Sequence, residues 1–505
     1  MKNKLIKFSL FILSVSFLIS QDYSSCIADP SRIERQQYIE PEQLQSQHFV
    51  IHFTIADDDY QIINGDEWSL QSNFSFAQSI LDLMEIALTK YIEDGWELPP
   101  PDCDESVTDI NSSNHCINYG GNSLYDIYIS NDGVGMVVPE RSYPVEPYTS
   151  GMTSYMKMST MLNEHTSLPG WAHHVVAHEL HHSIQLRYGY STSGTPGNYI
   201  HNAWFFEQSA SYMENVVFPY NTHLQTMLAN CNVVTPLTHP EHGIDYPAEL
   251  YQYRSALWHK FLVESQGDSS IVKLMWEDYG LEFATGSPVS LFPIYDNAIR
   301  TVSNDEYSIS AAYKDYAIWR YFTGERSLTN HYFNESSSYC TTTSYVLNDY
   351  IDNISFSNKG GTSFVELPLD NPTINFSTDY FDQVQLSYLT INQNNQISVE
   401  NLESISFEQN YNFNTSDILS HVFIVSPIYN GIEFQTINFD ISLSNMILGD
   451  ANFDQTINVL DVVILVNFAI GSSEPTDLEI EVCDLNFDGI INVLDVVQLI
   501  NLILT

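Results

Sequence analysis

The sequence predicts a multidomain chain with an α+β domain, an all-β sandwich-like domain and a small α-helical module that carries two EF-hand-like calcium loops. Three observations support this prediction. Strand and helix patterns alternate over residues 45–340, short alternating apolar runs between polar turns fill 345–447, and an oxygen-rich loop followed by an apolar helix occurs twice in 448–505. A chain of 505 residues has room for three such domains.

The N-terminal residues predict export. A lysine-bearing start at 1–4 precedes an apolar run at 5–19 that is too short for a stable membrane span, so we expect residues 1–20 to be a signal peptide. Residues 21–44 form an N-terminal segment, for which a short propeptide is one interpretation. Cys26 follows Tyr-Ser-Ser, a poor match to a lipidation site, so we do not expect a lipid anchor. No other run approaches the length of a transmembrane segment.

The charge of the chain limits its partners. Acidic residues outnumber basic ones by 63 to 17, which gives a net charge of −46. Such a chain repels nucleic acids and anionic membrane surfaces, so we expect neither as a partner. An exported protein can form disulfides. Cys103 and Cys116, in a loop rich in Asp, Asn and Ser, are the best candidate pair, while the other four cysteines cannot be paired from the sequence.

Hydrophobic periodicity predicts the elements of the α+β domain in the order strand, helix, strand, strand. They span His48–Thr54, Phe76–Asp94, Tyr125–Ile129 and Met152–Met158. The last run alternates enough to be an edge strand, and an extended peptide could pair with it if it borders a cleft. We expect further helices at 202–217, around 250–264 and at 270–276.

The strongest chemical signal is the motif His-Glu-Leu-His-His at 178–182, in the middle of a predicted helix over 171–188. Residues four apart share one face of a helix, so His178 and His182 can both present an imidazole to one zinc ion. Glu179 then lies beside that ion, where it can act as a general base. A histidine-rich surface helix is the alternative, and a pairing of His174 with His178 lacks the adjacent carboxylate.

A catalytic zinc ion usually has three protein ligands and one open position, so a third ligand must come from elsewhere. Glu207 lies on the next helix among aromatic and small residues, where a carboxylate is costly to bury without a cation. We therefore predict Glu207 as the third ligand. Glu214, on the same helix face, is an alternative ligand, but we favour it as a residue that holds a ligand histidine. His201 is a weaker candidate for the third ligand. The alternative without a metal is that Glu207 is an ordinary exposed residue of its helix.

The helix that follows the motif has the form W-x-x-E-x-x-A-x-x-x-E and, with the motif, resembles the gluzincins, zinc peptidases that include thermolysin. More closely, the chain resembles a group of secreted bacterial metallopeptidases. This resemblance covers about residues 45–330. It implies a zincin-like α+β domain, one zinc ion held by His178, His182 and Glu207, and Glu179 as catalytic base. Thermolysin-like enzymes place an aspartate four residues after the ligand glutamate, where this chain has Ser211. The residue that orients the ligand histidine therefore stays open.

The C-terminal repeat has the oxygen spacing of calcium loops, with side-chain oxygens at positions 1, 3, 5, 9 and 12 and a backbone carbonyl expected at position 7. The predicted ligands are Asp450, Asn452, Asp454, Thr456, Asn458 and Asp461 in the first loop and Asp484, Asn486, Asp488, Ile490, Asn492 and Asp495 in the second. Each loop runs into an apolar helix, at 459–470 and at 493–504. We expect two calcium ions.

This repeat resembles a type I dockerin over 448–505, which implies binding to a cohesin on a scaffold or surface protein. Position 6 of the loop is Gly489 in the second copy but Gln455 in the first, where a sharp turn favours glycine. Loop positions 10 and 11 usually face the partner in dockerins. Here they carry identical apolar pairs, namely Val459, Leu460, Val493 and Leu494. The alternative is that these residues fill the small core of the module.

Together the two resemblances imply a secreted zinc endopeptidase that acts on a protein or peptide and is tethered through a dockerin. A catalytically inactive, zincin-like binding or scaffold component is the alternative, and glycoprotein or cell-wall peptide is an alternative substrate. Tyr251, Tyr253 and His259 could donate to the oxyanion of a scissile carbonyl, although each has a structural role as its alternative. The β-rich region could be a spacer, a lid or a binding module.

Overall fold

The computed structural model describes residues 26–28, 34–101, 103–112, 115–168, 170–190, 202–329, 331–369, 371–432, 435–443, 448–452 and 456–504. The expected signal peptide lies outside them. The chain forms two compact units. The first contains the residues up to Thr343 with Phe356–Thr362 and Ser426–Thr436, and the second contains the other residues from Ser344 onward. In the described part of the chain, no helix is long and apolar enough to cross a membrane.

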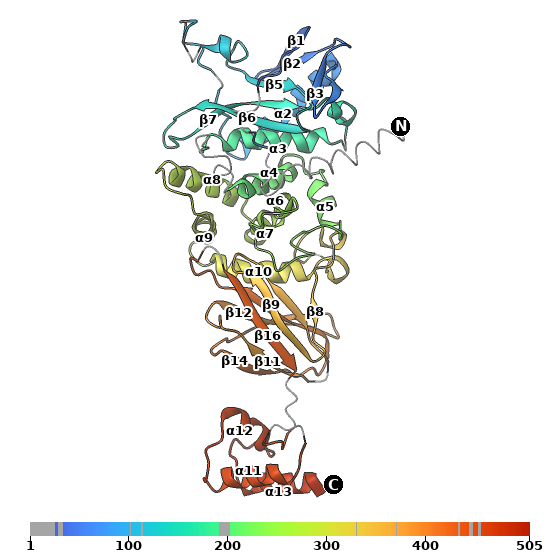
Figure 1. The fold of residues 1–505 in the computed structure, drawn as a ribbon, viewed down its shortest axis with the longest axis vertical. Coiled ribbons are helices and arrows are strands. Elements are labelled where there is room, and N and C mark those ends of the chain that lie inside the picture. The colour runs from blue at the N-terminus through green and yellow to red at the C-terminus, as the bar shows by residue number, and fades with distance from the viewer. Residues whose placement is uncertain are drawn as a thin grey trace. The chain divides into compact units, whose positions relative to one another are not determined.

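A mixed five-stranded sheet with the order β1-β2-β5-β7-β6 forms one half of the first unit (Figure 1). Its three inner strands are parallel, and both edge strands are antiparallel to their neighbours. The strands are β1 (Pro41–Gln45), β2 (Phe49–Thr54), β5 (Tyr125–Ile129), β6 (Gly135–Ser142) and β7 (Met152–Met158). A separate hairpin pairs β3 (Tyr60–Ile63) with β4 (Asp66–Ser69).

The prediction that Met152–Met158 is an edge strand is wrong. β7 lies between β5 and β6, and all of its residues are buried. Its alternating polar side chains are not solvated, because they find partners inside: Ser154 Oγ lies 2.8 Å from the hydroxyl of Tyr125, and Lys157 Nζ donates to Asp132 over 2.6 Å. The outer strand on this side of the sheet is therefore β6.

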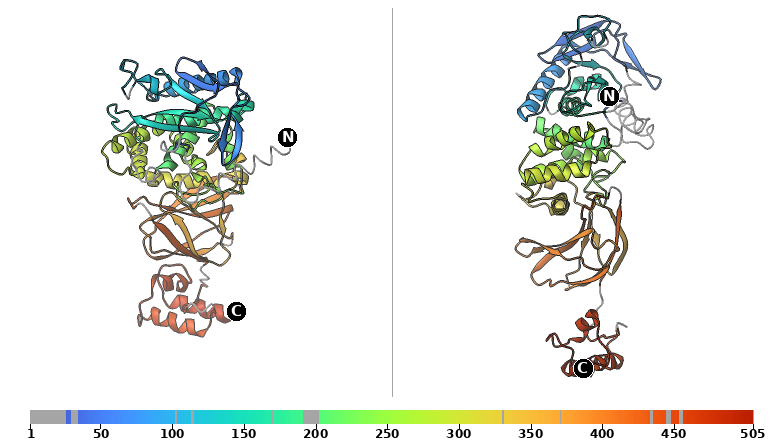
Figure 2. Two further views of the ribbon diagram at one scale, coloured as in Figure 1. Left: turned by 45° about the horizontal axis from the view of Figure 1, so that its top comes forward. Right: turned by 90° about the vertical axis from the view of Figure 1, so that its left-hand side faces the viewer.

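Helix α3 (Ala172–Gln185), which carries the histidine motif, packs against β6 and β7 and against α2 (Phe74–Glu93). α2 begins two residues before its predicted start, because the side chain of Asn73 accepts a hydrogen bond from the backbone of Phe76. α4 (Ala203–Val217) packs on α3 and leads into the helical half of the unit (Figures 1 and 2). α3 is therefore buried between the sheet and these helices, and it is not a surface helix.

The remaining helices of the first unit form its helical half together with α4 (Figure 1). They are α5 (His223–Leu228), α6 (Tyr251–Arg254), α7 (Leu257–Gln266), α8 (Ser270–Phe283), α9 (Leu291–Val302) and α10 (Ile309–Tyr321). A disulfide joins Cys231 to Cys340, and the predicted Cys103–Cys116 disulfide is also formed. The 109-residue separation of the first pair encloses most of this helical half. In the described part of the chain, Cys26 and Cys483 are the free cysteines.

Two sheets form the β-rich part of the chain, with the orders β13-β12-β15-β10-β8 and β14-β11-β16-β9. Phe423 of β15 contacts Phe376 of β11 and Tyr411 of β14, so the sheets pack through aromatic side chains. The strands are β8 (Tyr345–Val346), β9 (Tyr350–Ser357), β10 (Ser363–Glu366), β11 (Thr373–Ser377), β12 (Val384–Asn392), β13 (Ile397–Leu402), β14 (Glu408–Asn412), β15 (Ile418–Pro427) and β16 (Thr436–Leu443).

The C-terminal module contains α11 (Val459–Ala469), α12 (Asp477–Cys483) and α13 (Val493–Leu504). α11 and α13 contact each other and follow the two predicted calcium loops. Leu465, Cys483 and Leu499 are fully buried in its small core.

Candidate metal centre

Three predicted ligand atoms converge between α3 and α4. The Nε2 atoms of His178 and His182 lie 3.1 Å apart, and Oε2 of Glu207 lies 3.0 Å from the first and 3.4 Å from the second. A tetrahedral zinc ion with bonds of 2.0–2.1 Å would place its ligand atoms roughly 3.3 Å apart. The three atoms therefore have the spacing that a zinc ion requires, and the His178, His182 and Glu207 side chains are almost completely buried.

Hydrogen bonds at the far side of each ring orient the two imidazoles. His178 Nδ1 lies 2.9 Å from Glu214 Oε1, and an ionised carboxylate only accepts, so Nδ1 carries the proton. His182 Nδ1 lies 2.7 Å from Gln185 Oε1. The amide nitrogen of Gln185 donates to Phe206 O and Ser209 Oγ, which fixes its oxygen toward His182. Both Nε2 atoms are then lone-pair donors that point into the cluster.

A cation is the group that such a cluster needs. Two imidazole lone pairs and a carboxylate oxygen face one another in a buried site, where they repel unless positive charge lies between them. Burial opposes ionisation of Glu207, but positive charge at His182 and His178 outweighs it and holds the pKa of Glu207 below its ordinary value. Either protonated imidazoles or a bound zinc ion can supply that charge, and the donor set of two imidazoles and one carboxylate fits zinc.

The carboxylate of Glu179 lies beside this cluster. It follows His178 on α3, and its Oε2 is buried with no hydrogen-bond partner among the described residues. Burial raises the pKa of Glu179 to about 7, so it can both take and return a proton near neutral pH. Gly135 at the start of β6 leaves room for this side chain, because a Cβ there would lie 2.7 Å from Glu179 Oε1.

Glu214 has the geometry of a residue that holds a ligand histidine. Its Oε1 accepts from His178, and its Oε2 lies 2.7 Å from Nδ1 of His223. Burial opposes ionisation, but His223 and His178 hold the pKa of Glu214 below its ordinary value. Ser211 is buried, and its hydroxyl has no partner among the described residues. Glu214, and not Ser211, is therefore the residue that orients the imidazole of His178.

Of the other residues that the sequence indicated, Tyr253 contacts a histidine of the cluster. The ring of Tyr253 stacks on His178 at 5.8 Å, and burial holds its pKa well above the ordinary value, so its phenol stays protonated. His259 packs between Phe205 and Tyr212, and its nitrogens have no partner within the described structure. Tyr251 instead contacts His242 and Tyr246, and His174 stacks on His223, while His201 lies outside the described residues.

Sequence reasoning missed two residues of the cluster, Gln185 and Cys26. The ligand atoms of Cys26, His178, His182 and Glu207 all lie within 4.8 Å of one another. The backbone N–H of Cys26 donates to Glu207 Oε1 over 2.7 Å. Helical spacing could have indicated Gln185, which follows His182 by three residues. Nothing near Cys26 in the sequence indicates a contact with a helix so distant in the chain.

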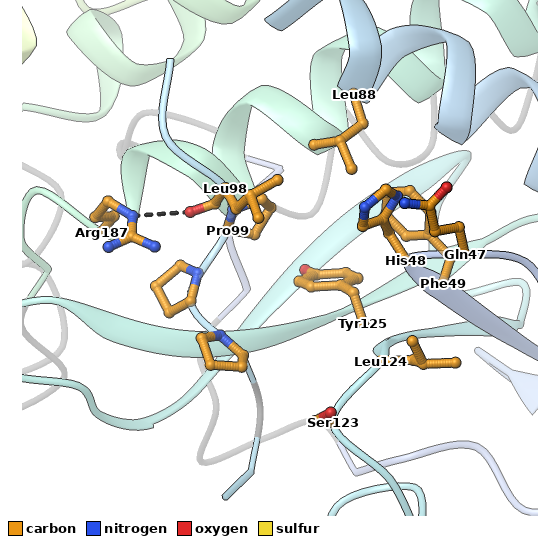
Figure 3. A pocket seen from close by; sticks show the side chains of 12 residues that line it. Gln47, His48, Phe49, Leu88, Leu98, Pro99, Ser123, Leu124, Tyr125 and Arg187 are labelled. Atoms are coloured by element: carbon orange, nitrogen blue, oxygen red, sulfur yellow. Dashed lines mark hydrogen bonds between the residues drawn. The ribbon is translucent and has the colours of Figure 1, made fainter. Parts of the chain in front are cut away.

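A surface pocket of about 240 Å³ lies elsewhere in the first unit (Figure 3). It is lined mainly by apolar side chains, including Leu88, Leu98 and Tyr125, and Arg187 donates to the backbone oxygen of Leu98 over 2.8 Å. The clustered ligands are not among its lining residues. The pocket and the metal centre are therefore separate features.

The two calcium loops have matching internal hydrogen bonds. Asp461 accepts from the backbone of Asn452 and Asn458, at 3.1 and 2.8 Å, and Asp495 accepts from the equivalent residues of the second loop at 3.2 and 2.8 Å. Each position-12 carboxylate therefore folds back over its loop. Gly489 has a φ of +80°, the left-handed turn that favours glycine, while Asp454 and Gln455 lie outside the described residues.

The repeated apolar pairs of the module are on its surface. Val459, Leu460, Val493 and Leu494 are between 57% and 66% exposed. These side chains therefore do not fill the core of the module, which was the alternative interpretation.

Family comparisons agree with the C-terminal prediction and leave the metal centre without a named activity. Residues 448–504 match the dockerin type I domain, so this module is a calcium-binding dockerin, which implies a cohesin partner. Residues 146–290 match a family of unknown function (DUF6055), and this range includes α3, α4 and the predicted ligands they carry. Among curated proteins, none matches the chain.

We predict different losses of zinc for the two glutamates of the cluster. Glu207→Ala removes a predicted ligand and its charge, whereas Glu214→Ala removes only the support of His178, which typically costs about 10- to 100-fold in affinity. We expect the larger loss for Glu207→Ala, measured by competition with a chelator and by metal mass spectrometry. Glu264→Ala is the control, because this carboxylate pairs with Lys260 away from the cluster. A larger loss for Glu214→Ala would reverse the ligand assignment.

The left-handed turn at Gly489 predicts a weaker calcium site in Gly489→Ala. A side chain in this conformation costs about 1–2 kcal/mol, or roughly 5- to 30-fold in affinity. Calorimetric titration of the full chain with calcium should show one weakened site and one unchanged site. Gly286→Ala is the matched control, because Gly286 has a φ of +75° and open space around it but lies outside the dockerin. Equal affinities in Gly489→Ala and the unaltered chain would exclude this role of the turn.

Proposed function

We propose that this protein is a secreted zinc-dependent endopeptidase that is tethered through its dockerin to a cohesin-bearing scaffold or surface protein. The observation that carries the proposal is the buried convergence of His178, His182 and Glu207 next to the unpartnered carboxylate oxygen of Glu179. A zinc ion at this position would supply Lewis acidity toward a peptide carbonyl and lower the pKa of a water molecule.

The residues of the chain divide the remaining work. Glu179 accepts the proton of the attacking water and returns it to the leaving amine. Tyr253, protonated and stacked on His178, donates to the oxygen of the carbonyl as it gains charge. Glu214 and Gln185 keep both imidazoles in the tautomer whose Nε2 lone pairs face the cluster. An extended peptide at the β6 edge passes close to Glu179, because Gly135, the first residue of β6, lies against the Glu179 side chain.

The alternative function is a catalytically inactive binding component. A zinc ion held by protein ligands can also have a purely structural role. One feature favours catalysis: Glu179 is a buried carboxylate beside the cluster that the predicted ligand set does not use. Zinc content with no cleavage of any peptide, by the unaltered chain and by Cys26→Ala alike, would favour the alternative.

Cleavage should depend on Glu179 while zinc binding should not. Glu179→Gln leaves the ligands intact, so we expect stoichiometric zinc with turnover lower by a factor on the order of 10² or more. Cleavage of casein and of a peptide library, with metal analysis of the same samples, measures both quantities. Cleavage by Glu179→Gln at the measurable rate of the unaltered chain would exclude Glu179 as the base.

The exposed Val-Leu pairs predict two equivalent cohesin-binding faces. Charged replacement of Val459 and Leu460 alone, or of Val493 and Leu494 alone, should leave affinity nearly unchanged, and replacement of both pairs should abolish binding. Ile470→Asp is the control, because Ile470 is also exposed but lies outside these loop positions. Surface plasmon resonance against cohesins would measure binding, and calcium titration would show that the module is folded. Full binding by the fourfold variant would place the partner surface elsewhere.

A further inference from the structure

We propose that Cys26 is a fourth zinc ligand and that residues 26–28 close the metal centre, so that the exported chain is latent. This inference rests on the proposed function, whose site it regulates. Cys26 Sγ lies in the cluster with the ligand atoms of both histidines and Glu207, all within 4.8 Å, and 3.6 Å from the hydroxyl of Tyr253. A thiolate is a preferred zinc ligand.

Coordination by Cys26 changes the type of zinc site. Four protein ligands are typical of structural zinc, whereas catalysis needs an open position for water or substrate. The Cys26 thiolate would occupy that position. It would also lie near both Glu179 and Tyr253, the two groups proposed to move or donate protons. A bound Cys26 therefore excludes the attacking water from the place where Glu179 could activate it.

The backbone around Cys26 occupies the edge where a peptide would bind. Val137 of β6 donates to the Cys26 carbonyl over 3.0 Å, and the Ala28 N–H donates to the Val137 carbonyl over 2.8 Å. Ile27 thereby forms a parallel bridge with Val137. The Cys26 N–H is also bonded to Glu207 Oε1. The segment is held at three backbone groups, so Cys26 is directed toward the cluster and is not a chance neighbour.

Residues further along the chain hold the segment to the same sheet. Arg35 donates from Nε and Nη2 to the two carboxylate oxygens of Glu140 on β6, over 2.9 and 2.7 Å. The hydroxyl of Tyr38, which has one proton to donate, lies 2.8 Å from the backbone oxygens of both His52 and Ile129 on neighbouring strands. These contacts keep the N-terminal segment near the β6 edge and raise the local concentration of Cys26 at the cluster.

The first test is the state of the Cys26 thiol in the full exported chain, with calcium present throughout. With zinc bound, alkylation of Cys26 by iodoacetamide should be slow, and a zinc-selective chelator should accelerate it at least tenfold, as measured by peptide mass spectrometry. Cys483 is the internal control, because it is buried in the calcium-binding module and should not respond. Equal alkylation of Cys26 with and without zinc, or a lipid on Cys26, would overturn the proposal.

A second readout is spectroscopic. Replacement of zinc by cobalt(II) should give a thiolate charge-transfer band in the unaltered chain and in Cys483→Ser, and this band should be absent in Cys26→Ala. Ala28→Pro keeps the thiol but removes the hydrogen bond to Val137, so it should speed alkylation, whereas Ala28→Ser, which retains the N–H, should not. Absence of the band in the unaltered chain would overturn the proposal.

Activity then separates this inference from the proposed function. Peptide cleavage should be at least tenfold faster in Cys26→Ala than in the unaltered chain, and Glu179→Gln in the Cys26→Ala background should abolish it. A thiolate band without cleavage by either variant would support Cys26 as a ligand while refuting the peptidase. Cleavage at equal rates by the unaltered chain and Cys26→Ala would refute latency while leaving the peptidase in place.

Discussion

The packing of α3 on α4 buries a carboxylate oxygen between two imidazole nitrogens, and the rest of the centre follows from this constraint. Three electron-pair donors at 3.0–3.4 Å from one another are stable only with positive charge among them. Glu214 and Gln185 are required because they fix which ring nitrogen carries the proton. The small residue at Gly135 is required because Glu179 occupies the space beside β6. The surrounding fold therefore holds in place a group of atoms that repel one another.

Local sequence spacing was enough to predict which side chains of α3 and α4 meet in the cluster. His178 and His182 follow from the four-residue period of a helix, and Glu207 follows from the cost of a carboxylate among aromatic side chains. Cys26 could not be predicted, because its contact depends on how the N-terminal segment meets an edge strand. The assignment of β7 failed for a related reason. The alternation of its side chains was read as exposure, but Lys157 and Ser154 have polar partners inside the unit.

The dockerin was predictable because each calcium loop is a local structure whose ligand positions are fixed along the chain. The repeat also indicated the glycine at 489, whose left-handed backbone the fold requires. Helix α12 was not predicted, although its signal was present: Thr476 and Glu479 form a capping box at its start. For the β-rich region the alternating runs predicted strands, but pairing order depends on contacts between distant segments, so the order of its two sheets could not be derived.

The bridge between Ile27 and Val137 has a consequence for the solubility of the protein. β6 is the outer strand of its sheet, and Val137 gives both its N–H and its carbonyl to residues 26–28. Loss of that segment would leave these groups as an open template to which another strand can add. A molecule without its N-terminal residues would then be prone to self-association along this edge. The net charge of −46 opposes such contact between copies through electrostatic repulsion, most strongly at low ionic strength.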